Sequence, residues 1–208
     1  MNCKLVHANA LLLMCFFTLS SYGQIQQNKH RVDTIGIAIK SELQKHLYPP
    51  VDSLTTKELA VFVLFPLGKP NSSLRLIEKN GKTYIEVRSL YKNVGEETLM
   101  AFVNHNYKPL SIQTDSFTVE VSRCFKNIML DAFKKTVHEK FINMFPKKIQ
   151  LYHGTSFKFW TNENGNTVSI NIKKDSDPLY FGQKFAKINL QIIDDLKNGV
   201  FDELKYEF

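Results

Sequence analysis

Two Asn-Gly dipeptides, Asn80-Gly81 and Asn164-Gly165, constrain the fold most strongly. Each lies between two stretches in which apolar and polar residues alternate. Asn-Gly accepts positive φ at both central positions of a two-residue turn, and alternation is typical of a strand with one buried face. The sequence therefore predicts two β-hairpins, whose strands are residues 74–79 with 83–89 and residues 155–161 with 167–173.

The hairpin strands also predict which side chains share a face, because successive side chains point to opposite sides of a sheet. In the first hairpin Ile85 and Val87 share one face. Tyr84, Glu86 and Arg88 lie on the other.

A helix is predicted after each hairpin. Residues 118–145 carry apolar side chains at steps of three to five, which indicates one helical stripe. The stripe consists of Val121, Phe125, Ile128, Ala132, Phe133, Val137, Phe141 and Phe145. Asp115 or Ser116 is expected to cap this helix, and Pro146 to end it. A second helix is predicted over residues 179–197, with Asn198-Gly199 as its stop.

The remaining segments give weaker patterns. Ile35, Ile39, Leu43 and Leu47 predict an N-terminal helix, with Asp33 as its cap and Pro49-Pro50 as its end. Residues 55–65 are ambiguous. Thr55 and Glu58 form a capping box, which favours a helix, whereas the run from Val61 to Phe65 favours a buried strand. A short helix is predicted from Glu96-Glu97 to Val103, and an extended segment over 110–117.

This order of elements predicts an α+β domain over residues 24–208, resembling a doubled β-β-α unit. The expected architecture is an antiparallel sheet of four to five strands, with the two helices on one face. The N-terminal helix and the segment 59–65 are expected to cover the remainder.

The first 23 residues have the layout of a secretory signal peptide. Lys4 supplies a basic start, an apolar run follows over residues 10–19, and Ser21 and Gly23 are the small residues that a signal peptidase reads. An apolar run of about ten residues is too short to span a bilayer. We therefore expect export to the periplasm or the extracellular space. Lipidation at Cys15 is an alternative, although Met14 is not the small residue that this chemistry needs.

Cysteine usage follows from this expectation. Removal of the signal would leave Cys124 as the single thiol, so the exported chain would have no internal disulfide and would depend on its apolar core. The sixteen phenylalanines and a hydrophobic content of 43% make such a core plausible. Cys124 is expected to be buried, because Val121, Phe125 and Ile128 surround it in the helical stripe.

Motifs for catalysis or metal binding are incomplete. His138-Glu139 begins like a zinc-protease helix, but Ile142 stands where the second histidine is required. Ser156 follows Gly154 as in a serine-hydrolase elbow, but Lys158 replaces the second glycine. Neither a catalytic residue nor a cofactor or metal is predicted. A hydrolase site assembled in space from His105, Cys124, His153 and Ser156 stays the enzymatic alternative.

Two surfaces are candidates for binding. Trp160, the one tryptophan, is expected to share a sheet face with Lys158, and Tyr84 and Arg88 join them if the hairpins are adjacent. Aromatic rings beside charged donors suit sugars or peptides, although Trp160 packed under a helix or loop is the simpler reading. The second surface is the basic side of the long helix, with Lys126, Lys134 and Lys135, where an anionic polymer could dock.

The chain resembles a group of small exported proteins of gut-dwelling anaerobic bacteria. The resemblance rests on the signal peptide, on residues 73–78 with 84–88, and on Gly154 to Phe159 before the final helix. That group has no known activity, so the resemblance implies a location at the envelope and no site residues.

The sequence thus predicts a non-catalytic binding or interaction module at the bacterial cell envelope. Its expected partner is an envelope protein or a glycan. A subunit of an envelope assembly, with residues 59–65 as its contact, is a further alternative. The formal net charge of +7 is modest, and no run of five basic residues occurs, so nucleic acid is not favoured. The oligomeric state is left open.

Overall fold

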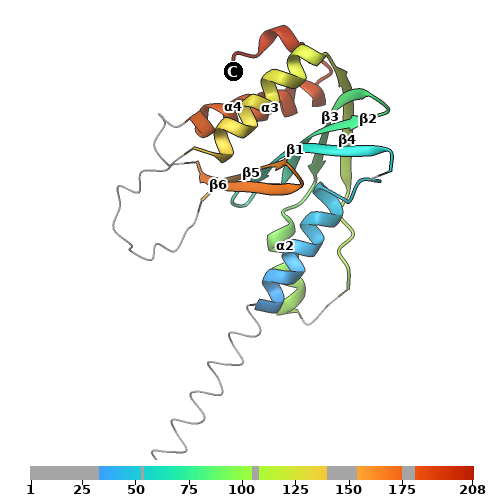
Figure 1. Ribbon diagram of the computed structural model, residues 1–208. Helices are drawn as coiled ribbons and strands as arrows, with labels where there is room; N and C mark the ends of the chain where they lie inside the picture. The colour runs from blue at the N-terminus through green and yellow to red at the C-terminus, as the bar shows by residue number, and fades with distance from the viewer. Residues whose placement is uncertain (1–32, 53, 105–107, 140–153, 175–180) are drawn as a thin grey trace, which may run out of the picture.

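A six-stranded antiparallel sheet forms the centre of the computed structural model, which describes residues 33–52, 54–104, 108–139, 154–174 and 181–208 (Figure 1). The strand order is β4-β3-β2-β1-β5-β6. The strands are β1 (Thr56–Phe65), β2 (Ser72–Lys79), β3 (Lys82–Leu90), β4 (Thr114–Val121), β5 (Ser156–Glu163) and β6 (Asn166–Lys173). The helices are an N-terminal helix, described over 33–47, α2 (Val94–Val103), α3 (Arg123–Val137) and α4 (Phe181–Lys197). The predicted α+β class is confirmed.

Both predicted hairpins are confirmed. Strands β2 and β3 pair around Asn80-Gly81, and β5 and β6 pair around Asn164-Gly165. Asn80 and Asn164 have φ of 52° and 50°, and the glycines that follow have φ of 76° and 81°. These values are the left-handed conformations that a two-residue hairpin turn requires.

The ambiguous segment 55–65 is a strand. As β1 it pairs with β2 on one side and with β5 on the other, so it separates the two hairpins. The hairpins are therefore not adjacent, so the condition for Tyr84 and Arg88 to join Trp160 is not met, and residues 59–65 are the middle of the sheet rather than a cover. Residues 60–63 are all fully buried, because both sheet faces are covered at this point. That double burial explains the unbroken apolar run.

The long helix is shorter than predicted at its start. Strand β4 continues to Val121, and Ser122 caps α3 by accepting a hydrogen bond from the Phe125 amide. The caps expected at Asp115 or Ser116 are wrong, because Thr118 to Val121 alternate in the period of a strand. Ile128 is 43% exposed, so it leaves the predicted stripe. Phe141 and Phe145 lie outside the described residues.

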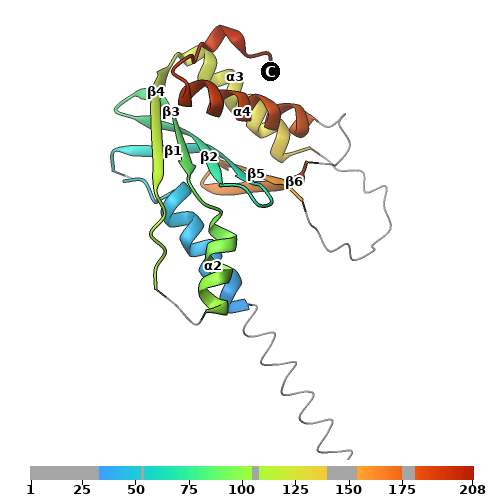
Figure 2. The ribbon, with the colours of Figure 1, turned by 180° about the vertical axis from the view of Figure 1, so that it is seen from behind.

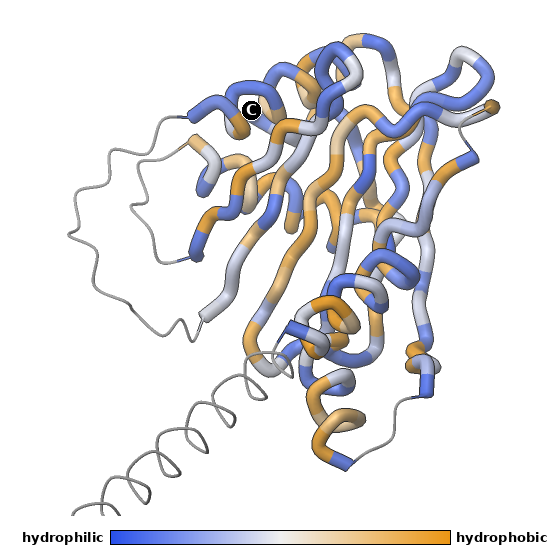
Figure 3. The backbone as a smooth tube through the Cα atoms, turned by 60° about the horizontal axis from the view of Figure 1, so that its bottom comes forward, coloured by the Kyte–Doolittle hydropathy of each residue, from blue (hydrophilic) through white to orange (hydrophobic). Residues whose placement is uncertain are grey.

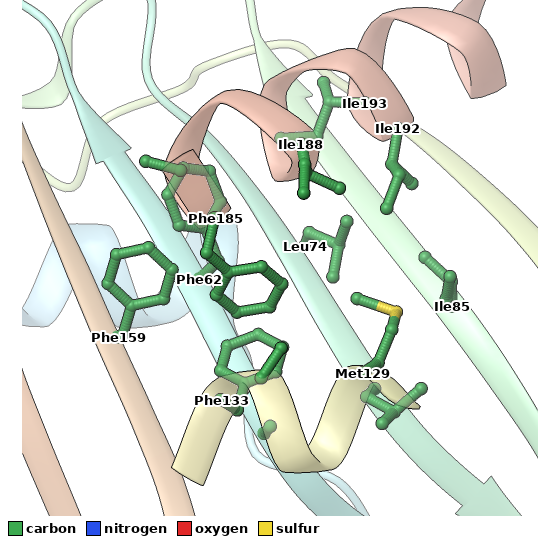
Figure 4. Close-up of a cluster of buried hydrophobic side chains, with 14 of the residues drawn as sticks. Phe62, Leu74, Ile85, Met129, Phe133, Phe159, Phe185, Ile188, Ile192 and Ile193 are labelled. Carbon is green, nitrogen blue, oxygen red and sulfur yellow. The ribbon is translucent and has the colours of Figure 1, made fainter. Parts of the chain in front are cut away.

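Helices α3 and α4 cover one face of the sheet, as predicted, and enclose the larger core (Figures 1 and 4). Phe62, Phe133, Phe159 and Phe185 are fully buried there. The Phe133 and Phe185 rings meet edge to face with centroids 4.9 Å apart, which joins the two helices. The C-terminal residues close this layer, because Tyr206 and Phe208 pack against the Phe125 ring.

The opposite face carries a smaller core beneath the N-terminal helix. Leu43 and Leu47 pack there with Val61, Val63 and Val94. Asp33 already lies within the helix, so it is not the cap that the sequence predicted. The coloured tube places apolar segments in the middle of the sheet and polar ones toward its rim (Figure 3).

The N-terminal helix and α2 project beyond one end of the sheet (Figures 1 and 2). We call this part the helical lobe and define it as residues 33–48, 66–71, 91–104 and 108–113. Side chains connect its segments. Asn93 donates to the carbonyls of Pro66 and Lys69, and Lys45 donates to the carbonyl of Leu110. The lobe is therefore a packed unit and not a set of separate loops.

Candidate binding surfaces

Trp160 and Lys158 lie on the same face of β5, as the alternation predicts, but the indole is covered. Trp160 is 9% exposed, and the Tyr48 ring packs edge-on against it with centroids 5.1 Å apart. The Lys158 Nζ lies 5.3 Å from the indole centroid, and the indole Nε1 donates to Glu58 Oε1 at 3.2 Å. A sugar ring stacks on an open aromatic face, and the structure offers none at Trp160.

Tyr84 and Arg88 lie on the same sheet face but not beside Trp160. Strands β2 and β1 stand between β3 and β5. Three strand spacings amount to about 14 Å. Arg88 Nε also donates to Glu86 Oε1 at 2.5 Å. Trp160 and Lys158 are thus separated from Tyr84 and Arg88, and a ligand role for these residues stays a prediction.

The most organised polar group in the described structure centres on Arg75, which the sequence reasoning missed. Arg75 is 3% exposed, and its Nη2 donates to both carboxylate oxygens of Glu86 at 2.9 Å. Its Nη1 donates to the Pro49 carbonyl at 2.7 Å. The turn at Asn80-Gly81 sets a register that places Arg75 directly opposite Glu86. This pairing could therefore have been predicted from the hairpin sequence.

A β-bulge brings Glu58 to the same group. The register between β1 and β2 shifts between Glu58 and Ala60, so the chain gains one residue there. Such a bulge re-aims the side chains that flank it. The Glu58 carboxylate accepts from the Trp160 indole and lies 3.5 Å from Arg75 Nη1.

The charges in this cluster are mutually stabilised. Burial opposes ionisation of Glu86, but hydrogen bonds and charge from Arg88 and Arg75 outweigh it and lower the pKa of the carboxyl. Burial, with a contribution from Glu58, raises the pKa of Tyr48. The charges of this group are paired inside the protein, although the buried Arg75 Nε has no hydrogen-bond partner among the described residues. A group with paired charges is suited to fixing structure rather than to chemistry on a substrate.

What the cluster fixes is the end of the N-terminal helix. Ser73 Oγ donates to the Leu47 carbonyl at 2.7 Å, and Arg75 holds the Pro49 carbonyl. Both acceptors lie where the helix runs out and leaves backbone carbonyls without helical partners. The cluster therefore attaches the helical lobe to the sheet by directed bonds.

The lysines predicted on α3 have different surroundings. Lys126 bonds Glu78, and this contact lowers the pKa of the Glu78 carboxyl. The Lys135 Nζ lies 3.9 Å from the centroid of the Phe181 ring. Lys134 is exposed. Lys126 is thus held in an ion pair, while Lys134 and Lys135 lie two turns further along α3.

The residues of the hydrolase alternative do not meet where they are described. Cys124 is exposed at the start of α3, so the expectation that it is buried is wrong. The registers place the start of α3 and Ser156 at opposite ends of the sheet and four strands apart, which is roughly 30 Å. His105 and His153 lie outside the described residues. Within the described ranges, no three His, Cys, Asp or Glu side chains are grouped to hold a metal ion.

Exposed apolar side chains concentrate on the helical lobe. The lobe carries six large ones, Ile37, Leu67, Tyr91, Leu99, Met100 and Val103, and the rest of the described chain carries four, Leu54, Ile128, Val200 and Leu204. Leu99, Met100 and Val103 are 48%, 56% and 56% exposed. Their spacing of three and four residues places them on one face of α2. We call these three residues the α2 patch.

Comparison of the chain with protein-family models, curated proteins and solved structures finds no match. In the part of the chain that is described, no helix has the length and apolar character needed to cross a membrane.

Proposed function

We propose that this chain is an exported, non-catalytic binding module that contacts a protein partner at the cell envelope through the α2 patch. The observation that carries the proposal is the exposure of Leu99, Met100 and Val103 on one side of a helix that projects from the sheet. Contiguous exposed apolar side chains rimmed by polar residues are typical of interaction sites. The signal-peptide layout of residues 1–23 supports the location.

Charge around the lobe specifies the partner. Most of its acids are engaged, because Glu97 pairs with Lys92, Glu42 pairs with Lys45, and Glu96 accepts from the Gly68 amide, which leaves Asp33. Three exposed lysines of the lobe, Lys40, Lys69 and Lys108, have no ion-pair partner among the described residues. The partner is therefore a protein surface with an apolar centre and an acidic rim. A protein is favoured over a neutral glycan because the indole of Trp160 is covered.

The test is site-specific photo-crosslinking in cells that export the full chain. A photoreactive residue replaces Met100 in one strain and Ile128, an exposed apolar residue on α3, in the other. We expect a discrete heterologous adduct from position 100 and none from position 128. Equal adducts at both positions, or none at position 100, would overturn the proposal. An adduct of twice the chain's mass would show that the partner is a second copy of the chain.

Binding of the purified adduct partner then tests the surface. We expect Met100→Gln/Val103→Gln to weaken binding about tenfold or more, since truncation at an interface centre commonly costs over 1 kcal/mol. The matched control, Ile128→Gln/Val200→Gln, removes similarly exposed apolar surface elsewhere and should bind as wild type. If the wild type binds anionic vesicles instead of a protein, and Met100→Gln/Val103→Gln weakens that binding, the assignment of a protein partner is wrong.

A further inference from the structure

We infer that the helical layer carries a second, separate binding site, formed by Lys134, Lys135, Lys184 and Lys187, that binds an acidic polysaccharide. This lysine patch belongs to α3 and α4, on the sheet face opposite the N-terminal helix. It does not rest on the α2 patch or on the proposed protein partner.

Two contacts bring the lysines of the two helices together. The Phe133 and Phe185 rings meet at 4.9 Å, and the Lys135 Nζ lies 3.9 Å from the Phe181 ring centroid. The last two turns of α3 therefore lie beside the first two turns of α4. Neighbouring helix axes in such a pair are about 8–10 Å apart.

The four lysines point away from the core. Positions 134 and 135 are exposed on α3, and positions 184 and 187 are exposed on α4, where the residues between them are buried. Lys184 and Lys187 are three residues apart and so share the outer side of their helix. All four side chains consequently lie on the solvent side of the layer formed by α3 and α4.

Acidic side chains do not neutralise this surface in the described structure. The Glu139 carboxylate accepts the Phe181 and Gly182 amides at 2.8 and 2.9 Å, so it caps α4. Asp131 is one turn from Lys134 and Lys135 and is exposed, but it forms no ion pair among the described residues. The patch therefore keeps a net positive charge from its four lysines, while the Glu139 carboxylate offsets the positive end of the α4 dipole.

The chemistry of the patch favours a polysaccharide with spaced charges. Lysine ammonium groups are hydrated point charges that do not provide the planar two-pronged donors by which arginine fixes a single carboxylate or phosphate. The one aromatic ring identified beside them, Phe181, already lies against Lys135, so stacking of unpaired bases has no platform here. An acidic polysaccharide needs neither feature, because many weak contacts along the polymer add up.

The test is binding of polygalacturonate to the purified chain, with neutral dextran as the uncharged reference. We expect a dissociation constant that rises about tenfold or more between 50 and 200 mM salt, as for other polyelectrolytes that release counterions. Lys134→Gln/Lys184→Gln should weaken binding about tenfold at the lower salt concentration. Asp131→Asn, which removes the nearby negative charge, should tighten it.

The matched control is Lys57→Gln/Lys79→Gln. These two lysines are exposed on neighbouring strands at the end of the sheet, so the control removes the same charge from another surface. It should bind polygalacturonate as wild type. Equal weakening by both double variants, or no binding by the wild type, would overturn the site. Tighter binding of duplex DNA or of anionic vesicles with the same dependence on Lys134 and Lys184 would overturn the assignment of a polysaccharide.

Discussion

The two faces of the sheet are built from the same strands and held by different forces. In β2, Leu74 and Leu76 are fully buried against α3 and α4, and on the other side Ser73 and Arg75 bond the end of the N-terminal helix. Apolar contact is not directional, whereas a hydrogen bond fixes both distance and angle. The first face therefore has the larger apolar core, and on the second face directed bonds beside a smaller core set the orientation of the helical lobe.

The difference has a consequence for function. The α2 patch is useful to a partner only if the lobe holds one position relative to the sheet. Arg75 is attached to both parts, because it bonds Glu86 on the sheet and the Pro49 carbonyl at the base of the lobe. We therefore regard Arg75 as a positioning residue for the proposed interface.

The largest effect is expected on the apolar face. Phe185→Ala removes a fully buried ring that meets Phe133 at 4.9 Å and Phe159 at 5.6 Å. Such a truncation costs about 3–5 kcal/mol of unfolding free energy. Urea denaturation measures it. If this variant does not fold, Phe185→Leu keeps most of the volume and is expected to lose about 1.5 kcal/mol. A loss below about 1 kcal/mol for Phe185→Ala would contradict the expectation that the core beneath α3 and α4 is the main source of stability.

On the polar face, Arg75→Met is expected to lose about 3 kcal/mol, because Glu86 keeps its buried charge and loses one of its two arginines. Arg75→Met/Glu86→Leu should recover much of this loss. The emission of Trp160, which Tyr48 covers from the base of the lobe, should shift to longer wavelength in the single variant. A double variant as unstable as the single one would show that lost packing, rather than unpaired charge, dominates.

As the pH falls, the polar contacts that attach the helical lobe should break before the apolar core beneath α3 and α4 unfolds. The pKa of Glu86 is lowered from its ordinary value of 4.5, so its stabilisation is complete above that value and is lost as pH falls through the folded pKa. We expect Trp160 emission to change at a higher pH than the helical circular dichroism, to which α3 and α4 contribute more residues than the N-terminal helix and α2.

The control for this acid transition is Glu86→Gln. It is expected to lose about 2 kcal/mol at pH 7, the size of hydrogen bonds to a charged group, and to flatten the emission change. On the sheet face covered by α3 and α4, the pKa of Asp195 is also lowered. Its carboxylate accepts hydrogen bonds from Lys205 Nζ and from the Tyr206 hydroxyl. An unchanged acid midpoint in Glu86→Gln would therefore assign the transition to another carboxyl with a lowered pKa, that of Asp195 or of Glu78.

The hairpins were predictable because their information is local. An Asn-Gly turn fixes the register of the strands beside it, and so it also determines the Arg75–Glu86 pair. The position of β1 was not predictable in this way. Its pairing with β5 joins residues about a hundred positions apart, and a run that is buried on both faces loses the alternation that identifies a strand.

For the candidate surfaces, too, the local features were predictable from the sequence and the long-range contacts were not. The sequence placed Trp160 and Lys158 on one face correctly, but the Tyr48 ring that covers the indole comes from a distant segment. Lys134 and Lys135 were identified on α3. Lys184 and Lys187 join them only through the packing of α3 on α4, which no local pattern encodes.

The smallest effect is expected at Cys124, on the outer side of the apolar layer. The apolar neighbours Val121, Phe125 and Ile128 suggested that this thiol is buried. The strand in fact runs to Val121 and Ser122 is the cap, so Cys124 is the second residue of α3 and is exposed. Cys124→Ser should change the unfolding free energy by less than about 0.5 kcal/mol, as is usual for surface substitutions.

The neighbouring residue Phe125, 4% exposed, provides the control, because Phe125→Ala should lose about 3 kcal/mol of unfolding free energy. The native thiol should also react with a disulfide reagent nearly as fast as the urea-unfolded chain does. Strong protection in the native state would mean that Cys124 is buried, as its apolar neighbours in the sequence suggested.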